Sequence, residues 1–240
     1  MSFLAQRWVP GIVGISTYVD YAYQKEMQLT AVRAAGTDGP INQLRTVTVT
    51  LDFNLLVANL QSGNREAAEE QVAATAQALQ AGGADFIVVT SGTTSTLTAR
   101  ARQRVSMPFL DLAEAAWIDV GSVTPVGLLS TTYAAAGGIF QAIAERRGAK
   151  LILPQPQTAA RVDQAIFGEL IRGQIAEESV RILREAIAEL VDLGAVSVIL
   201  GNTDMTLVAD QLQSTASVQL IDSARAHARA AARAALDGHL

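Results

Sequence analysis

The sequence predicts an α/β protein made of two similar lobes, each built on a parallel β-sheet. Short apolar runs alternate with segments of helical periodicity along the 240 residues, and this alternation is typical of parallel sheets with right-handed crossovers. Three pieces of the first half recur in the same order in the second half. Hydroxyl-rich turns follow several apolar runs, which is where α/β sheets bind their ligands.

The internal repeat consists of three matched pairs of segments. Each pair combines an apolar run with similar flanking residues, and the offset within a pair is 115, 111 and 111 positions, respectively. The matched pairs are residues 10–18 with 125–133, 83–95 with 194–206, and 107–111 with 218–222. Three matches in one order favour duplication over the chance likeness that all βα units share.

The first half contains four predicted strands and the helices that connect them. Residues 46–53 alternate valine with threonine, as a half-buried strand does. Asn64 is placed to cap a long helix. The predicted strands are residues 8–15, 46–53, 85–89 and 108–111. The predicted helices are one that Ser16 or Thr17 caps and that continues through Met27, then residues 54–60, 65–80, 96–104 and 112–120, with a loop over residues 36–40.

The second half repeats this order. The helix over residues 177–193 is amphipathic, with Val180, Leu183, Ile187 and Leu190 on one face. The other predicted elements are strands at residues 124–129, 151–154, 196–200 and 218–222, a loop at residues 155–160, and helices at residues 140–147, 161–172 and 223–236. We expect an N-terminal lobe of residues 1–115, a second lobe of residues 116–222, and a C-terminal helix, residues 223–240, that packs back on the first lobe.

Composition excludes several classes of function. The net charge is −5 and no basic run occurs, which argues against nucleic-acid binding. The chain has no cysteine, so disulfides, thiolate metal sites and thiol catalysis are excluded, and no metal-ligand cluster stands out. No apolar run approaches the roughly 20 residues of a membrane span. We also expect no leader, because residues 1–7 are too short for one. A soluble cytoplasmic protein with no membrane partner is therefore expected.

The polar turns form the predicted binding site. Two duplicated halves that face each other would bring these turns into one cleft, where hydroxyls and helix N-terminal N–H groups bind a carboxylate or phosphate well. A nucleotide is not favoured, because the chain has neither a Walker pattern nor a clean GxGxxG. The alternative is that each turn only caps a helix. The residues concerned are Ser16, Thr17, Ser91, Gly92, Thr93, Thr94, Ser130, Thr131, Thr132, Asn202, Thr203 and Asp204.

Few side chains are candidates for acid–base chemistry. His227 follows Asp222 in the last helix and is placed to face the cleft, and Asp204 lies at the end of a strand. His239 is near the terminus and is not expected to take part. Weaker candidates are Tyr18, Tyr133, Lys25 and Asp52. For each candidate a structural role is at least as good an explanation, with Asp204 as a helix cap and the tyrosines packed at the edge of the cleft.

These motifs resemble the aspartate/glutamate racemase family, which includes hydantoin racemases and decarboxylases. The resemblance covers nearly the whole chain, in residues 11–14, 51–53, 83–89, 126–131, 173–179 and 198–204. It implies two α/β lobes related by a pseudo-twofold axis, with the site between them, and often a homodimer. It also implies catalysis without pyridoxal phosphate, metal or other cofactor. In the family, two cysteines face the substrate Cα from opposite sides.

This chain departs from the family pattern at the catalytic positions. Ser91 and Asn202 occupy the two cysteine positions, and Gly92, Ser95 and Asp204 replace the family's Asn, His and Glu. A serine hydroxyl is too weak an acid to act as a thiol does, and an amide cannot act as a base. Two-thiol racemisation therefore cannot occur here. A single engineered Cys-to-Ser change would not remove the neighbouring residues as well, so natural divergence is favoured over redesign.

Two functions remain open at the level of sequence. The first is an enzyme that keeps the carboxylate site and transfers protons in an isomerisation, decarboxylation, elimination or cyclisation. Ser91, Thr93, Thr131 and Thr203 would then hold the carboxylate, and Asp204, His227 or a tyrosine such as Tyr18 would move protons. The second is a catalytically inactive pseudo-racemase that binds a small acid or a partner protein. Trp8, Ile15 and Tyr18 hint at a ligand larger and more apolar than aspartate.

Overall fold

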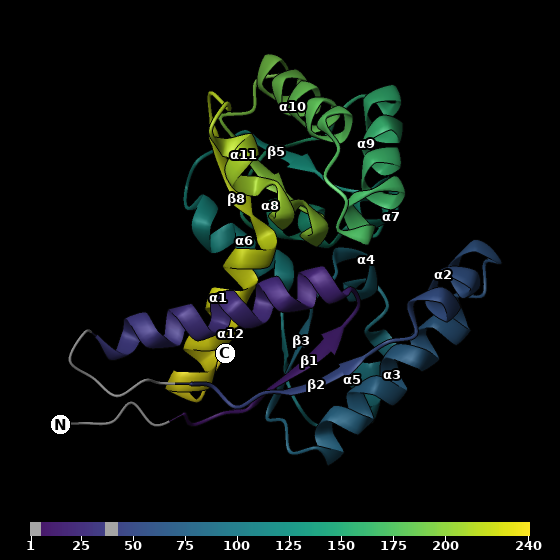
Figure 1. The fold of residues 1–240 in the computed structure, drawn as a ribbon, viewed down its shortest axis with the longest axis vertical. Coiled ribbons are helices and arrows are strands. Elements are labelled where there is room, and N and C mark those ends of the chain that lie inside the picture. The colour runs from purple at the N-terminus through teal and green to yellow at the C-terminus, as the bar shows by residue number, and fades with distance from the viewer. Residues whose placement is uncertain (1–5, 37–42) are drawn as a thin grey trace. The chain divides into compact units, whose positions relative to one another are not determined.

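The computed structural model describes residues 6–36 and 43–240, and it divides into two compact units (Figure 1). Unit 1 comprises Met1–Asp111 with His227–Leu240, and unit 2 comprises Leu112–Ala226. The first boundary between the units falls after residue 111, whereas the sequence predicts it after residue 115. The second division falls within the C-terminal helix, so that the first four residues of this helix, 223–226, belong to unit 2.

Unit 1 is organised around a four-stranded parallel sheet of order β2-β1-β3-β4. Its strands are β1 (Pro10–Gly14), β2 (Val47–Thr50), β3 (Phe86–Val89) and β4 (Phe109–Leu110). Figure 1 shows α3 and α5 side by side, and both contribute to one buried cluster with the sheet. The helices are α1 (Thr17–Ala35), α2 (Phe53–Gln61), α3 (Arg65–Ala81), α4 (Gly92–Ser95) and α5 (Ala99–Arg104), together with most of α12 (Ser223–Asp237).

Unit 2 has the same topology, with a parallel sheet of order β6-β5-β7-β8. Its strands are β5 (Val126–Leu129), β6 (Leu151–Ile152), β7 (Ser197–Leu200) and β8 (Gln219–Asp222). The α-helices are α6 (Leu112–Val120), α7 (Thr132–Ala136), α8 (Ile139–Arg146), α9 (Pro156–Gly168), α10 (Glu177–Asp192) and α11 (Ala209–Gln213). Two 3-10 helices, η1 (Leu170–Arg172) and η2 (Thr203–Leu207), complete the unit. The predicted α/β class and the repeated parallel sheets are thus confirmed.

A close helix–strand contact is repeated in both units. A Cβ placed on Gly11 of β1 would lie 2.7 Å from Cβ of Ala84 and 3.3 Å from Cβ of Leu79. A Cβ placed on Gly127 of β5 would lie 3.2 Å from each of the corresponding atoms of Ala195 and Leu190. Glycine therefore lets the long helix that precedes β3 or β7 pack directly on the neighbouring strand. Because the residues that each glycine meets are 111 positions apart in the two units, the contact supports the internal repeat.

The structure corrects one detail of this repeat. Val13 pairs with Val89 and Leu129 pairs with Leu200, so the first strands match at an offset of 116 rather than 115. The N-cap residues that follow, Ser16 and Thr131, keep the offset of 115. The turn of unit 2 is therefore one residue shorter than that of unit 1.

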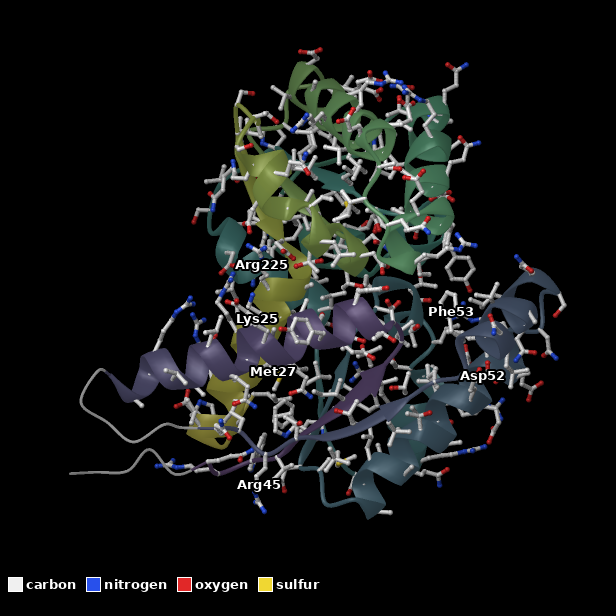
Figure 2. All side chains as sticks on the ribbon, viewed as in Figure 1. Lys25, Met27, Arg45, Asp52, Phe53 and Arg225 are labelled. Carbon is white, nitrogen blue, oxygen red and sulfur yellow. The ribbon has the colours of Figure 1, made fainter. Side chains whose placement is uncertain are left out.

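Several expected helices are confirmed at the level of side chains. Asn64 caps α3, because its Oδ1 accepts a hydrogen bond from the Ala67 N–H at 3.2 Å. The predicted apolar face of α10 is buried in the core of unit 2. On α1, Met27 is wholly buried whereas Lys25 is exposed, and both are labelled in Figure 2.

The loop predicted at residues 155–160 is wrong, because α9 begins at Pro156. Proline suits the first turn of a helix, where its missing N–H costs no hydrogen bond. Glu189 of α10 also fixes this start, since its carboxylate accepts hydrogen bonds from the Gln155 N–H and the Thr158 hydroxyl. The short helices α4, α7 and α11 were not predicted as helices. Most of the loop predicted at residues 36–40 lies outside the described residues.

Candidate functional site

In unit 1, hydroxyl-bearing turns follow β1 and β3, which are neighbours in the sheet. Ser91 caps α4, because its Oγ accepts a hydrogen bond from the Thr94 N–H at 3.2 Å. Thr94 is itself fully buried, and its Oγ1 has no hydrogen-bond partner among the described residues. Ser16 occupies the N-cap position of α1 without making a side-chain cap bond, and its Oγ is likewise buried and unpartnered. Adjacent strand ends thus bring Ser16, exposed Thr17, Ser91, Gly92, Thr93 and Thr94 to one edge of the unit 1 sheet.

Asp20 lies at the same sheet edge and was not predicted as a site residue. Its Oδ1 accepts hydrogen bonds from the Thr90 hydroxyl at 2.8 Å and from the Ile15 N–H at 3.2 Å. Burial raises the pKa of Asp20, although these hydrogen bonds oppose the shift. Asp20 therefore ties the β1–α1 turn to the residue that precedes Ser91. The signal in the sequence was an acidic residue in the first turn of the helix that begins at the predicted site residues Ser16 and Thr17.

Asp52 follows β2 and serves as the cap of α2. Its Oδ1 accepts a hydrogen bond from the Leu55 N–H at 3.0 Å, and the residue is exposed at the start of α2 (Figure 2). The contacts of unit 1 thus give Asp52, predicted as a site residue, the role of a helix cap.

In unit 2, the turn after β5 combines three hydroxyls with different surroundings. Thr131 is fully buried and caps α7 through the Ala134 N–H, at 3.1 Å from its Oγ1. Thr132 is exposed, and Asp163 of α9 accepts hydrogen bonds from both its N–H and its hydroxyl. Ser130 is only 5% exposed, and its Oγ has no hydrogen-bond partner among the described residues. A buried hydroxyl left without a partner is costly unless a ligand or water satisfies it.

The turn after β7 places Asn202, Thr203 and Asp204 together. The Asn202 Oδ1 accepts a hydrogen bond from the Asp204 N–H at 3.0 Å, and Thr203 and Asp204 are buried. In the same turn, the Thr206 hydroxyl donates to Asp222 at the end of β8, at 2.7 Å. Burial raises the pKa of Asp222, although the hydrogen bond from Thr206 opposes the shift.

His227 has a different environment from the one that the sequence analysis gave it. Instead of facing a cleft, its ring is fully buried in unit 1, with Nδ1 3.1 Å from the Tyr23 hydroxyl and Nε2 3.2 Å from the Leu110 carbonyl oxygen. A carbonyl oxygen only accepts, so Nε2 carries the proton and Nδ1 accepts from Tyr23. Burial lowers the pKa of His227 to about 4, against the opposing effect of Asp111. The ring is therefore neutral and both of its nitrogens are engaged.

The two tyrosines named with the site, Tyr18 and Tyr133, are 47% and 36% exposed. Each follows the N-cap of the first helix of its repeat, by two residues. Both tyrosines thus lie in the first turn of a helix that follows a strand of their own unit. The expectation that the turns of the two units face a common cleft stays a prediction.

The described residues also bear on metal sites and on membrane spans. Within residues 6–36 and 43–240, no group of three or more His, Cys, Asp or Glu side chains is arranged to hold a metal ion. None of the helices in this part of the chain is long and apolar enough to cross a membrane.

Comparisons with known proteins agree with this architecture. A candidate Asp/Glu racemase from Yersinia pestis has 26% sequence identity and a TM-score of 0.81, over 95% of this chain and 99% of that chain. An aspartate racemase homologue from Pyrococcus horikoshii OT3 has 22% identity and a TM-score of 0.74, over 95% and 98% of the two chains. Glutamate racemase from Francisella tularensis, solved with D-glutamate, has 13% identity and a TM-score of 0.68, over 97% and 82%.

The sequence itself also matches a family model. The model that describes Asp/Glu/hydantoin racemases matches residues 27–231, which is most of the chain and includes parts of both units. Together with the repeated α/β topology, this match shows that the chain belongs to the Asp/Glu/hydantoin racemase family.

Proposed function

We propose that this protein is an enzyme of the racemase family that binds a small carboxylate and transfers a proton without thiols. One observation carries the proposal: the residues at the two cysteine positions are oriented by capping bonds. Ser91 Oγ and Asn202 Oδ1 each accept a backbone N–H. The hydroxyl proton of Ser91 and the amide protons of Asn202 are then left as donors toward a ligand.

Such donors suit a reaction in which negative charge develops on a carboxylate or enolate. Pre-oriented neutral donors stabilise an enolate-like intermediate by several kcal/mol, because they need no reorganisation as the charge forms. Thr93 in unit 1, and Ser130, Thr131 and Thr203 in unit 2, would add to the binding of the carboxylate. The unpartnered Oγ of Ser130 supports this role most directly.

Proton transfer is assigned to Asp204, with Tyr18 as the second candidate. Asp204 is 7% exposed and follows Asn202 in the turn after β7, and a shielded carboxyl group close to the bound substrate is a suitable general base. His227 is given a packing role instead, because Tyr23 and the Leu110 carbonyl engage both of its ring nitrogens. The reaction types that this set supports are isomerisation, decarboxylation, elimination and cyclisation.

The proposal is tested by incubating the protein in D2O with carboxylates and following deuterium at Cα by NMR. We expect no exchange with L- or D-aspartate or glutamate, and turnover with one or more larger carboxylates. Asp204→Asn should abolish that turnover, whereas the matched control Asp192→Asn, at the exposed end of α10, should preserve it. Binding without turnover of any carboxylate would favour the inactive pseudo-racemase instead.

A double variant tests whether two introduced thiols restore the family's reaction at the same site. Ser91→Cys combined with Asn202→Cys places the only two thiols of the chain at the family's cysteine positions. We expect the double variant to exchange the Cα proton of an amino acid and each single variant to remain inactive. Exchange of aspartate by the unaltered chain would overturn the proposal that these two residues ended the two-thiol reaction. The expectation of a cytoplasmic homodimer without cofactor stays a prediction.

A further inference from the structure

A pocket of about 250 Å³ lies in unit 2, beyond the carboxyl ends of β5 and β6. Its walls come from β5 and the turn after it, from α7, from the segment after β6, and from α9. The lining residues are Leu128, Ser130, Thr132, Ala135, Ala136, Leu153, Pro154 and Ala159. The pocket is therefore formed by unit 2 alone, next to the turn that we assign to carboxylate binding.

The walls of this pocket are apolar except at one side. Six of the eight lining residues are leucine, alanine or proline, and none of the eight is charged. The polar side consists of Ser130, whose Oγ is buried without a partner, and Thr132, whose hydroxyl donates to Asp163. The Asp163 carboxylate disfavours a second carboxylate beside Thr132, which it contacts. An acidic side chain, as in aspartate or glutamate, would find no cation among the lining residues.

The internal repeat shows how the surroundings of the pocket in unit 2 differ from the same place in unit 1. In unit 1 the corresponding positions hold Asp20 and Thr90, which are hydrogen-bonded to each other across the turn. In unit 2 these positions hold Ala135, at an offset of 115, and Gly201, at an offset of 111. A Cβ on Gly201 would lie 2.6 Å from Leu128 Cδ1 and 3.3 Å from Ser130 Cβ, two of the lining residues. Small residues thus replace the polar pair: Ala135 lines the pocket, and two other lining residues, Leu128 and Ser130, pack closely against Gly201.

From this we infer that the pocket receives an apolar group of the substrate, of the size of a branched aliphatic or phenyl group. The inference rests on the proposed function and specifies its substrate class: a carboxylate with an apolar substituent in place of an acidic side chain. Size supports it, because closed apolar cavities of about 150 Å³ already accommodate benzene. Ser130 lies at the junction, where its hydroxyl donates to the carboxylate while Leu128 and Ala135 contact the apolar group.

The experiment measures equilibrium binding of acetate, succinate and 3-phenylpropionate to protein with 13C-labelled alanine and leucine methyl groups. We expect 3-phenylpropionate to bind at least about 30-fold more tightly than acetate, since each buried CH2 group contributes about fourfold. It should shift the methyl signals of Ala135 and Leu153. Succinate should bind no more tightly than acetate. Tighter binding of succinate than of 3-phenylpropionate would overturn the inference.

Substitutions of lining residues test whether the preference for 3-phenylpropionate over acetate arises in this pocket. Ala135→Leu fills the pocket and should reduce the preference for 3-phenylpropionate over acetate about tenfold or more, since it removes several buried CH2 contacts. Ala142→Leu, on the exposed side of α8, is the matched control and should keep the preference. Leu153→Asn serves as a second variant that poses little risk to folding, because Leu153 is 43% exposed, and it should weaken the preference too. An unchanged preference in both pocket variants would refute the assignment.

A neutral probe separates the two proposals. If 3-phenylpropanamide shifts the Ala135 methyl signal but none of the carboxylates binds, the pocket is apolar as inferred and the proposed carboxylate function fails. If acetate binds but neither phenyl compound shifts Ala135, the carboxylate site stands and the inference about the pocket fails. If none of the probes binds, both fail.

Discussion

Acidification should destabilise unit 1 through His227. Burial lowers the pKa of His227 from an ordinary 6.5 to about 4. Below pH 6.5 the unfolded chain therefore takes up a proton at this residue that the folded chain does not. Because the unfolded state then binds more protons, stability falls as the pH decreases, with the whole effect developing between pH 6.5 and about 4. From pH 7 to pH 5 the expected loss is about 2 kcal/mol.

The chain offers a direct assay and a matched control, because it contains two histidines. Urea unfolding of the unaltered chain, His227→Gln and His239→Gln at pH 7 and pH 5 isolates the contribution of each ring. We expect His227→Gln to be less stable at pH 7, since Gln cannot reproduce both bonds to Tyr23 and Leu110. Between pH 7 and pH 5 it should lose about 2 kcal/mol less stability than the unaltered chain. His239→Gln should behave like the unaltered chain.

NMR gives the decisive observation. The ring proton signals of His227 should not titrate between pH 7 and pH 5. A midpoint of 6 or higher for His227 would refute the reasoning, because it would mean that the ring accepts a proton without losing its place between the Tyr23 hydroxyl and the Leu110 carbonyl oxygen. Equal pH dependence of the unaltered chain and His227→Gln would refute it as well.

Three further predictions concern other parts of the fold. Gly11→Ala should cost about 1–3 kcal/mol in urea unfolding, because the new Cβ would lie 2.7 Å from Ala84 Cβ, whereas Gly168→Ala meets no atom within 4 Å and should not destabilise. Asn64→Ala should cost about 1 kcal/mol, since it removes the cap of α3, and an unchanged urea midpoint would contradict that role. Burial raises the pKa of Asp20, so the free energy of unfolding should fall as the pH rises above 3.8 and this carboxyl group ionises in the folded chain. Asp20→Asn should make this decline less steep. The same pH dependence of unfolding in the variant and the unaltered chain would contradict the effect of burial on Asp20.

The sequence by itself determined the fold class, the duplication and the loss of the two-thiol mechanism. Period-2 and period-3.6 patterns report which side of an element is buried, so the strands and the buried face of α10 could be read in advance. The turn residues at strand ends could also be listed, because parallel sheets place every carboxyl end at one edge. The absence of cysteine needed no structure at all.

Tertiary structure decided which polar residues are in contact, and with what. The sequence suggested His227 as an acid–base residue. In the structure its ring is buried, and both ring nitrogens form hydrogen bonds, with the Tyr23 hydroxyl and the Leu110 carbonyl oxygen. Asp20 looked like an ordinary residue of a helix, but a hydrogen bond over 70 positions joins it to Thr90.

The pocket in unit 2 likewise depends on residues that are distant in the sequence. Ala135, Leu153 and Ala159 are unremarkable along the chain and become the walls of one cavity only when α7, the segment after β6 and α9 come together. Periodicity records the environment of one element at a time. Burial of a polar group and the shape of a cavity are set by contacts between elements, and no local pattern encodes them.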